Sequence, residues 1–411
     1  MTVSFTLSPQ QQELRTAVRA FARTEFPGLM AQVRAEPDPR TRAQLLRPTF
    51  EKAVAAGLLR GLIPVPFGGS AANGVDAAIF VEEWAAESPD FTISLAGPLI
   101  ALAPVYEAGT SEQISRFVAP FLATSGAPVA AMAFSEPAGS ANFDAPAPAA
   151  GILTTAVRDG EDWVVNGSKA WASHLCGWDG DGPDLMTIVC RTAGGISLIV
   201  AEREHLAGHI EVEEYLDLPA LRGCMTTRIR LRDVRVPARN LLGREGDGPR
   251  LVRGAFMASG ASIGLFAVAA MRQAWDITYR FAQSETRGGA VPIIEHQAVS
   301  DVLADTKGKI EAARLLGWRA MDAVLSQHPA AAELALHSKI FGSETGVAVI
   351  NDLIKVVGVS AYNDSFPILR FLSEALAYPL IEGSNTGVRR RWLQELFTAQ
   401  GFDPLAASGL S

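Results

Sequence analysis

The chain has 411 residues, of which 48% are hydrophobic, 19% charged and 8% aromatic, with a net charge of −8. This composition supplies a large apolar core and excludes a disordered chain. The 36 basic and 44 acidic residues are spread along the sequence, which argues against a nucleic-acid-binding protein. Three cysteines without Cys-x-x-Cys spacing predict neither a disulfide framework nor a zinc site. No secretory leader pattern and no membrane-spanning run is recognised, so a cytoplasmic protein is expected.

Helical periodicity dominates the first third of the chain. Ser8 and Gln11 can form a capping box around Pro9, and Pro27 is expected to end the first helix. Further helices are predicted at residues 48–59, 76–87, 99–108 and 111–123.

Short β-type segments dominate the middle third. Asn166-Gly167 is a hairpin signal, and residues 145–150 form an Ala/Pro-rich loop. A small antiparallel barrel or sandwich is therefore predicted, with strands at 154–157, 163–165, 185–190, 196–201 and 227–234.

The last third is again helical. Four long apolar-periodic segments predict a four-helix bundle, and they cover residues 251–284, 296–326, 330–357 and 367–400. The predicted fold is mainly α with a central β-domain. Its parts are an N-terminal helical domain (1–126), a β-domain (127–246) and a C-terminal helical bundle domain (247–411). This order excludes a doubly wound sheet and a barrel of alternating strands and helices.

Two motifs that could bind a metal or a cofactor have simpler readings. His205 and His209 have the spacing of two metal ligands on one helix face, but they lie in a polar stretch without a third ligand. They are interpreted as a surface pair, and no metal site is predicted. The glycines of residues 243–248 lack the surrounding βαβ unit of a dinucleotide fingerprint, which favours a turn.

Three other segments could carry chemistry. Residues 133–142 form a turn rich in small and hydroxylated residues that could offer N–H groups to a polar ring or a phosphate. Because side chains alternate along a strand, Trp171 and Ser173 are expected to share one face, either as a platform for a flat heterocycle or as a core indole and a solvated hydroxyl. Glu382 ends an apolar run before a basic helix start, either as a general base or as a helix-ending acid.

Taken together, these segments resemble the acyl-CoA dehydrogenase superfamily of flavoproteins, most closely its nitroalkane oxidase branch. Residues 135–140 (Ser-Glu-Pro-Ala-Gly-Ser) match the flavin loop, and residues 166–173 (Asn-Gly-Ser-Lys-Ala-Trp-Ala-Ser) match the flavin strand. Residues 233–243 match the signature that closes the β-domain, and 381–384 (Ile-Glu-Gly-Ser) match the turn that carries the base. Residues 177–179, 286–289, 293–297, 365–367 and 387–391 add similarity to the nitroalkane oxidase branch.

The resemblance implies roles for single residues. Glu382 is the expected base, with Ser259 and Arg389 near its carboxylate. The implied cofactor is FAD, and the residues expected to contact it are Phe134, Ser135, Ser140, Trp171, Ser173, Arg287, Gln297, Ser384 and Thr386. Since Arg287 and Gln297 match positions that reach across a subunit interface, a homotetramer built as a dimer of dimers is expected.

The residue at the base position divides the prediction of function. Acyl-CoA dehydrogenases have Glu there, as this chain does, whereas nitroalkane oxidase has Asp. Glu382 therefore favours removal of an α-proton with hydride transfer to flavin N5, in α,β-dehydrogenation of an acyl-CoA or acyl-carrier-protein thioester. The alternative is a nitroalkane oxidase that forms an aldehyde or ketone plus nitrite, with oxygen reoxidising the flavin. The electron acceptor, oxygen or an electron-transfer flavoprotein, stays open.

Overall fold

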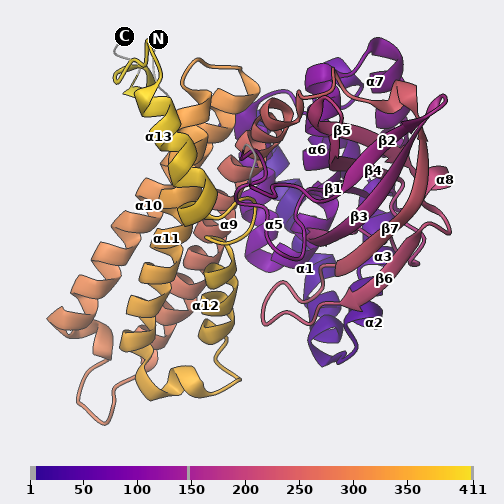
Figure 1. The fold of residues 1–411 in the computed structure, drawn as a ribbon. Coiled ribbons are helices and arrows are strands. Elements are labelled where there is room, and N and C mark those ends of the chain that lie inside the picture. The colour runs from indigo at the N-terminus through magenta and orange to yellow at the C-terminus, as the bar shows by residue number, and fades with distance from the viewer. Residues whose placement is uncertain (1–5, 146–148, 409–411) are drawn as a thin grey trace. The chain divides into compact units, whose positions relative to one another are not determined.

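The structure, a computed structural model, describes residues 6–145 and 149–408 and divides into two compact units (Figure 1). The bundle unit comprises Met1–Arg23, Asn73–Pro89 and Met257–Ser411. The β unit comprises Thr24–Ala72 and Asp90–Phe256. The predicted order of helices, strands and helices is confirmed. The three domain boundaries stay a prediction, and the loop expected at 145–150 lies partly outside the described residues.

Long helices build the bundle unit, and α10, α11 and α12 run alongside one another (Figure 1). A buried carboxylate links its segments, because Glu82 accepts hydrogen bonds from Arg314 (2.9 Å) and from the Trp318 indole (2.7 Å) and pairs with Arg272. The helices are α5 (Gly74–Glu87), α10 (Gln297–Leu325), α11 (Ala331–Val357), α12 (Ile368–Ala377) and α13 (Arg390–Thr398), together with the first part of α1 (Pro9–Ala35) and the part of α9 (Gly248–Ser284) that begins at Met257.

Seven strands in the β unit form one curled sheet in the order β1-β4-β2-β3-β7-β6, with β5 paired to β4. The pairings of β4 with β1 and with β2 are parallel, and the others are antiparallel. Its buried face is apolar, with Trp163, Val165, Ile188 and Ile229 at 4% exposure or less. The strands are β1 (Ala130–Ala133), β2 (Thr155–Asp159), β3 (Asp162–Ser173), β4 (Leu185–Thr192), β5 (Gly195–Glu202), β6 (Ile210–Tyr215) and β7 (Thr226–Pro237).

Helices of four to 20 residues accompany this sheet in the β unit. They are α2 (Pro39–Gln44), α3 (Arg47–Ala55), α4 (Leu58–Leu62), α6 (Pro89–Ala108), α7 (Ser111–Val118) and α8 (Arg203–Leu206). The helix predicted at 48–59 is divided at Gly57, which adopts a φ of +75°. Helix α6 begins ten residues before the predicted start.

The first helix shows one correct and one wrong prediction. Ser8 and Gln11 form the predicted reciprocal capping bonds. Pro27 does not end the helix, because α1 continues to Ala35. The buried positions Ala22, Phe26, Leu29 and Val33 keep helical spacing past the proline, so continued burial outweighs the one backbone hydrogen bond that Pro27 cannot donate.

The hairpin predicted at Asn166-Gly167 is also wrong. Strand β3 runs through both residues, and the turn between β2 and β3 lies at Gly160, with a φ of +61°. Asn166 and Gly167 instead lie at a register shift against β7. Gly167 fits there because a Cβ would come within 2.7 Å of the Thr154 backbone.

Three helices are long and apolar enough to cross a membrane, judged by length and composition only, contrary to the reading of the sequence. They are Pro89–Ala108, Gly248–Ser284 and Ala331–Tyr362, and between 33% and 72% of their most apolar windows is buried. Cys176, Cys190 and Cys224 are buried free thiols. The cytoplasmic location stays a prediction.

Candidate active site

The turn between α12 and α13 interrupts the helical segment predicted at 367–400. Helix α12 ends at Ala377, and a π-type turn at Asn385–Arg389 leads into α13. The Asn385 backbone N–H donates to the Pro379 carbonyl (2.9 Å), which closes the intervening chain into a loop. We name residues 378–385 the base loop, because Glu382 stands within it.

Glu382 adopts a strained backbone conformation. Its φ is +53°, in the left-handed region that costs a residue with a side chain about 1–2 kcal/mol. The Ser259 hydroxyl, on α9, hydrogen-bonds its carboxylate. Glu382 Oε2 is buried and has no hydrogen-bond partner within residues 6–145 and 149–408. One end of the carboxylate is thus held while an oxygen stays available to a ligand.

Burial raises the pKa of Glu382 above that of an ordinary glutamate. The Ser259 hydrogen bond and the positive charges of Arg389 and Lys339 act in the opposite direction and favour the ionised carboxylate. A partly buried carboxylate with a raised pKa is a stronger proton acceptor than one in water. This environment suits a general base.

Arg389 is fully buried and holds the backbone at Glu382. Its Nε donates to the Glu382 carbonyl oxygen (3.0 Å), and Nη2 donates to the same atom. Burial lowers the pKa of Arg389 to about 10 against the opposing effect of Glu382, so the guanidinium stays charged near neutral pH. The three predicted catalytic residues Glu382, Ser259 and Arg389 therefore lie together in the bundle unit, and their roles stay predictions.

A buried ion pair joins the predicted flavin loop to the predicted flavin strand in the β unit. Lys169 Nζ donates to Glu136 Oε1 (3.1 Å) and to the carbonyls of Phe134 (3.2 Å) and Val189 (2.7 Å). Glu136 also accepts from the Thr154 backbone N–H (2.8 Å) and hydroxyl (2.7 Å). No role was predicted for this pair, although Lys169 lies on β3 in step with Trp163 and Val165, which are buried as well.

Trp171 and Ser173 end strand β3. Trp171 has a φ of +73° and lies at a register shift between Ala170 and Ser173, so the strict alternation assumed in the sequence analysis does not hold there. Its indole is 53% exposed, which excludes the reading of a core indole. An uncovered indole with a hydroxyl two residues away fits one face of a flat ring such as isoalloxazine.

The other predicted flavin contacts in the β unit already make hydrogen bonds within the chain. The Phe134 N–H donates to Met132, and the Ser135 carbonyl accepts from the Ala170 N–H (2.9 Å each). Ser140 Oγ accepts from the Glu136 N–H (3.0 Å) and is buried. Ser140 therefore closes the flavin loop, and its hydroxyl could interact with a phosphate only by donating its proton in a hydrogen bond.

The remaining predicted FAD contacts lie in the bundle unit. Arg287 has a φ of +52° and donates to the Val357 carbonyl. Gln297 begins α10 and donates to Asp301 (2.7 Å). Ser384 caps the π-type turn by accepting from the Gly387 N–H (3.1 Å), and Thr386 is exposed. Their contacts with FAD stay predictions.

His174, which follows β3 directly, is a buried neutral imidazole. Both ring nitrogens lack a hydrogen-bond partner in the described part of the chain, and the ring lies edge-on to Trp178 at 4.8 Å. Burial lowers the pKa of His174 to about 4.

His174 should make the protein sensitive to acid. In the unfolded chain the imidazole binds a proton below about pH 6.5, whereas the folded chain resists protonation until about pH 4. The free energy of unfolding therefore has its full value above about pH 6.5. It decreases by up to about 3 kcal/mol as the pH falls from about 6.5 to about 4. Urea unfolding of wild type and His174→Asn, which tolerates the φ of +59°, at both ends of the window tests this. An equal pH dependence in the two proteins would contradict it.

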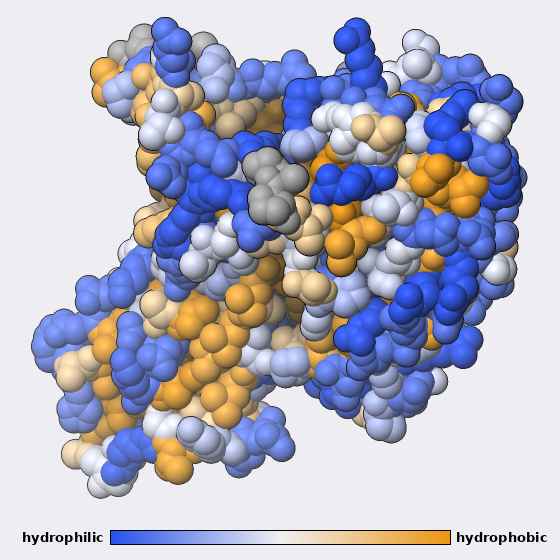
Figure 2. Space-filling model, viewed as in Figure 1, coloured by the Kyte–Doolittle hydropathy of each residue, from blue (hydrophilic) through white to orange (hydrophobic). Residues whose placement is uncertain are grey.

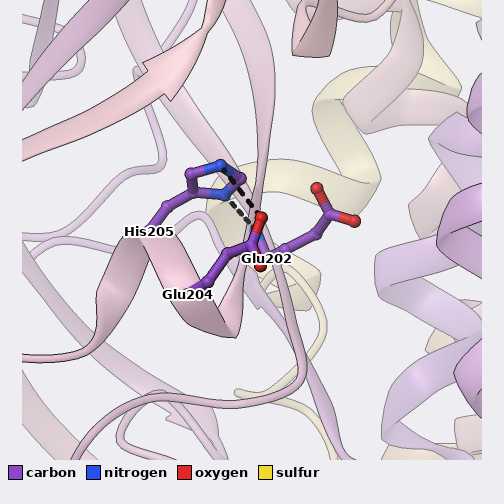
Figure 3. A group of neighbouring side chains, drawn as sticks. All are labelled: Glu202, Glu204 and His205. Atoms are coloured by element: carbon purple, nitrogen blue, oxygen red, sulfur yellow. Dashed lines mark hydrogen bonds and ion pairs between the residues drawn. The ribbon is translucent and has the colours of Figure 1, made fainter.

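Glu202, Glu204 and His205 form a compact group at the start of α8 (Figure 3). His205 Nδ1 accepts from the Glu202 N–H (3.1 Å) and so caps the helix, and the Glu204 side chain is 81% exposed. His209, the other histidine of the predicted surface pair, contacts the Arg232 carbonyl (2.8 Å) through Nδ1. Helix capping accounts for the position of His205 without a metal.

Comparison with known proteins identifies the family. Residues 8–125 match the acyl-CoA dehydrogenase N-terminal domain, and residues 246–396 match the acyl-CoA dehydrogenase C-terminal domain. Nitroalkane oxidase from Podospora anserina is 36% identical over 98% of both chains, and that from Fusarium oxysporum is 34% identical over 99% of this chain and 97% of its own. The solved Podospora anserina enzyme superposes with a TM-score of 0.95 at 35% identity, covering 99% of this chain and all of the other.

A more distant relative is cyclohexane-1-carbonyl-CoA dehydrogenase from Syntrophus aciditrophicus, 28% identical over 92% of this chain and 95% of its own. Members of both groups are FAD flavoproteins. The chain belongs to the acyl-CoA dehydrogenase family and is a FAD-dependent, nitroalkane oxidase-like oxidoreductase.

Proposed function

We propose that this enzyme oxidises nitroalkanes to aldehydes or ketones and releases nitrite. The observation that carries the proposal is the 34–36% identity to two nitroalkane oxidases over nearly the whole chain, against 28% for the acyl-CoA-type relative. It replaces the acyl-thioester reaction as the leading hypothesis. One nitroalkane, one O2 and one water give one carbonyl product, one nitrous acid and one hydrogen peroxide.

In this proposal Glu382 removes the proton from the carbon that bears the nitro group. Its unpartnered Oε2 is the atom free to receive that proton, and Ser259 holds the carboxylate. Arg389 fixes the backbone at Glu382 and keeps positive charge beside the carboxylate. When FAD is bound, it accepts the two electrons of the oxidation, and Trp171 and Ser173 are the groups of the β unit that would hold its ring.

A second candidate is α,β-dehydrogenation of an acyl thioester, favoured by the identity of residue 382. Solved nitroalkane oxidases include an active-site Asp→Asn variant crystallised with 1-nitrooctane, whereas this chain has Glu at the matching motif position. One extra methylene moves the carboxylate by about one C–C bond. A misplacement of that size can change a rate by about 100-fold.

Anaerobic mixing of the FAD-loaded enzyme with 1-nitrohexane and, separately, with a panel of acyl-CoAs separates the two functions. We expect 1-nitrohexane to bleach the flavin with one nitrite released for each flavin reduced, and, once air is admitted, one nitrite for each 1-nitrohexane consumed. Bleaching by an acyl-CoA alone would overturn the proposal in favour of the second candidate.

We also propose that the chain works as a homo-oligomer, with a homotetramer as the expected form. Figure 2 shows apolar residues gathered over the bundle unit, where Phe341, Leu376 and Leu380 are 42–69% exposed. A contiguous apolar patch is usually covered by a partner, and a second copy is the simplest one. A monomeric mass by light scattering at micromolar concentration would exclude this.

A further inference from the structure

A buried lysine lies next to the base loop and was not singled out from the sequence. Lys339, on α11, is fully buried, and its Nζ donates to the Tyr378 carbonyl and to Asn385 Oδ1 (3.0 Å). Tyr378 and Asn385 are the first and last residues of the base loop. One ammonium group thus holds both ends of the segment that carries Glu382.

A second layer of hydrogen bonds fixes the Asn385 end of this clamp. Asn385 Nδ2 donates to Ser343 Oγ (3.0 Å) and to Glu344 Oε1 (3.1 Å), and both residues lie on α11. Glu344 in turn accepts hydrogen bonds from Nη1 (2.6 Å) and Nη2 (2.9 Å) of Arg390. The loop ends are therefore bound to α11 by side chains that orient one another.

A clamp of this kind has a physical purpose because Glu382 is strained. A residue with a side chain leaves the left-handed region unless the surrounding structure imposes it. Arg389 restrains Glu382 from within the turn, and Lys339 restrains the loop from the neighbouring helix. Releasing either end should increase the motion of the loop backbone around Glu382.

Lys339 also contributes charge. The charged groups that face it are Glu382 in the loop, Arg389 in the π-type turn and Glu344 on its own helix. Glu382 and Glu344 favour the ammonium form, whereas burial and Arg389 oppose it and lower the pKa of Lys339 to about 7. Below that pH the ammonium stabilises the ionised Glu382 carboxylate.

We propose that Lys339 is a positioning residue that clamps the base loop at both ends and whose positive charge favours the ionised form of the Glu382 carboxylate. This inference rests on the proposed role of Glu382 as the base. It holds whether the substrate is a nitroalkane or an acyl thioester. Lys339 touches no reacting atom in this scheme and acts only through Glu382 and its loop.

Two variants separate the clamp from the charge. Lys339→Gln keeps hydrogen-bond donors but removes the positive charge that favours the ionised carboxylate, so the pKa of Glu382 should rise. Asn385→Ala keeps the charge but removes the clamp at one end, so the loop should loosen with little change in that pKa. Lys355→Met, at an exposed position of the same helix, is the matched control.

Both readouts work without substrate. The pKa of Glu382 is measured by difference infrared titration between about pH 5 and about pH 9, with its carboxyl band assigned as the one that Glu382→Gln lacks. The looseness of the loop is measured by hydrogen exchange at the backbone of residues 378–390. We expect the pKa rise in Lys339→Gln, and in Asn385→Ala exchange at least about fivefold faster than in wild type. Folded variants that match Lys355→Met in both measurements would overturn the proposal. Because neither readout uses a nitroalkane, a failure here is distinguishable from a failure of the proposed function.

Discussion

Glu382→Gln should slow reduction of the flavin by substrate by about a thousandfold or more while FAD stays bound. Glutamine has nearly the same shape and can still accept the Ser259 hydrogen bond, but it cannot receive a proton. The purified variant should therefore be yellow and should not bleach when mixed anaerobically with 1-nitrohexane or with the acyl-CoA panel. Stopped-flow absorbance of the flavin measures the rate.

Two controls sharpen this test. Glu395→Gln changes an exposed carboxylate on α13 and should leave the reduction rate within about twofold, because surface substitutions of this kind have small effects. Glu382→Asp retains a base but shortens the side chain, so it should reduce the flavin faster than Glu382→Gln. Undiminished bleaching in Glu382→Gln would remove the base assignment.

The pH dependence of flavin reduction follows from the direction of the Glu382 shift. The rate should rise with pH as Glu382 loses its proton and should then level off. Since burial raises the pKa of Glu382, the midpoint of that rise should lie above the value of an ordinary glutamate.

Lys169→Met should be the most destabilising of the changes considered in the β unit, by about 3–5 kcal/mol. Methionine has a similar stem but leaves Glu136, which is 3% exposed, as a buried charge without its cation. Burial alone would raise the pKa of Glu136, but Lys169, Thr154 and two backbone N–H groups outweigh it and hold the pKa low. Urea unfolding monitored by circular dichroism gives the change in free energy.

The double variant Lys169→Met/Glu136→Gln should recover part of this loss, because it removes the unpaired charge. Lys52→Met, which breaks the exposed pair with Glu25, should cost no more than about 1 kcal/mol. A Lys169→Met variant as stable as Lys52→Met would show that the buried pair does not hold the flavin loop to the flavin strand.

The sequence predicted best those features that depend on neighbouring residues. The Ser8–Gln11 cap needs only four residues, and it is present. The Pro27 prediction was wrong because the burial of Phe26, Leu29 and Val33 is a tertiary effect that a local rule for proline cannot include. The hairpin at Asn166-Gly167 failed for a similar reason, since Gly167 is required by its closeness to Thr154, the residue that precedes β2.

Some residues of the candidate site were predicted from the sequence and one was missed. Glu382, Ser259 and Arg389 were identified through a family resemblance, and the structure places them in contact. Lys339 was missed because lysine ordinarily indicates a solvated surface. The helical spacing held a partial signal, since Ala335, Lys339 and Ser343 follow one another every four residues and share the buried face of α11.

The division of the chain into units has a consequence for its synthesis. The bundle unit draws on Met1–Arg23 and Asn73–Pro89, yet most of it begins only at Met257. A ribosome adds about 5–20 residues per second, so the early segments wait on the order of ten seconds or more for the helices against which they pack. During that interval α5 can pack against α1 but not against α10, its other partner in the folded unit, so the nascent chain exposes an apolar surface that the folded protein covers.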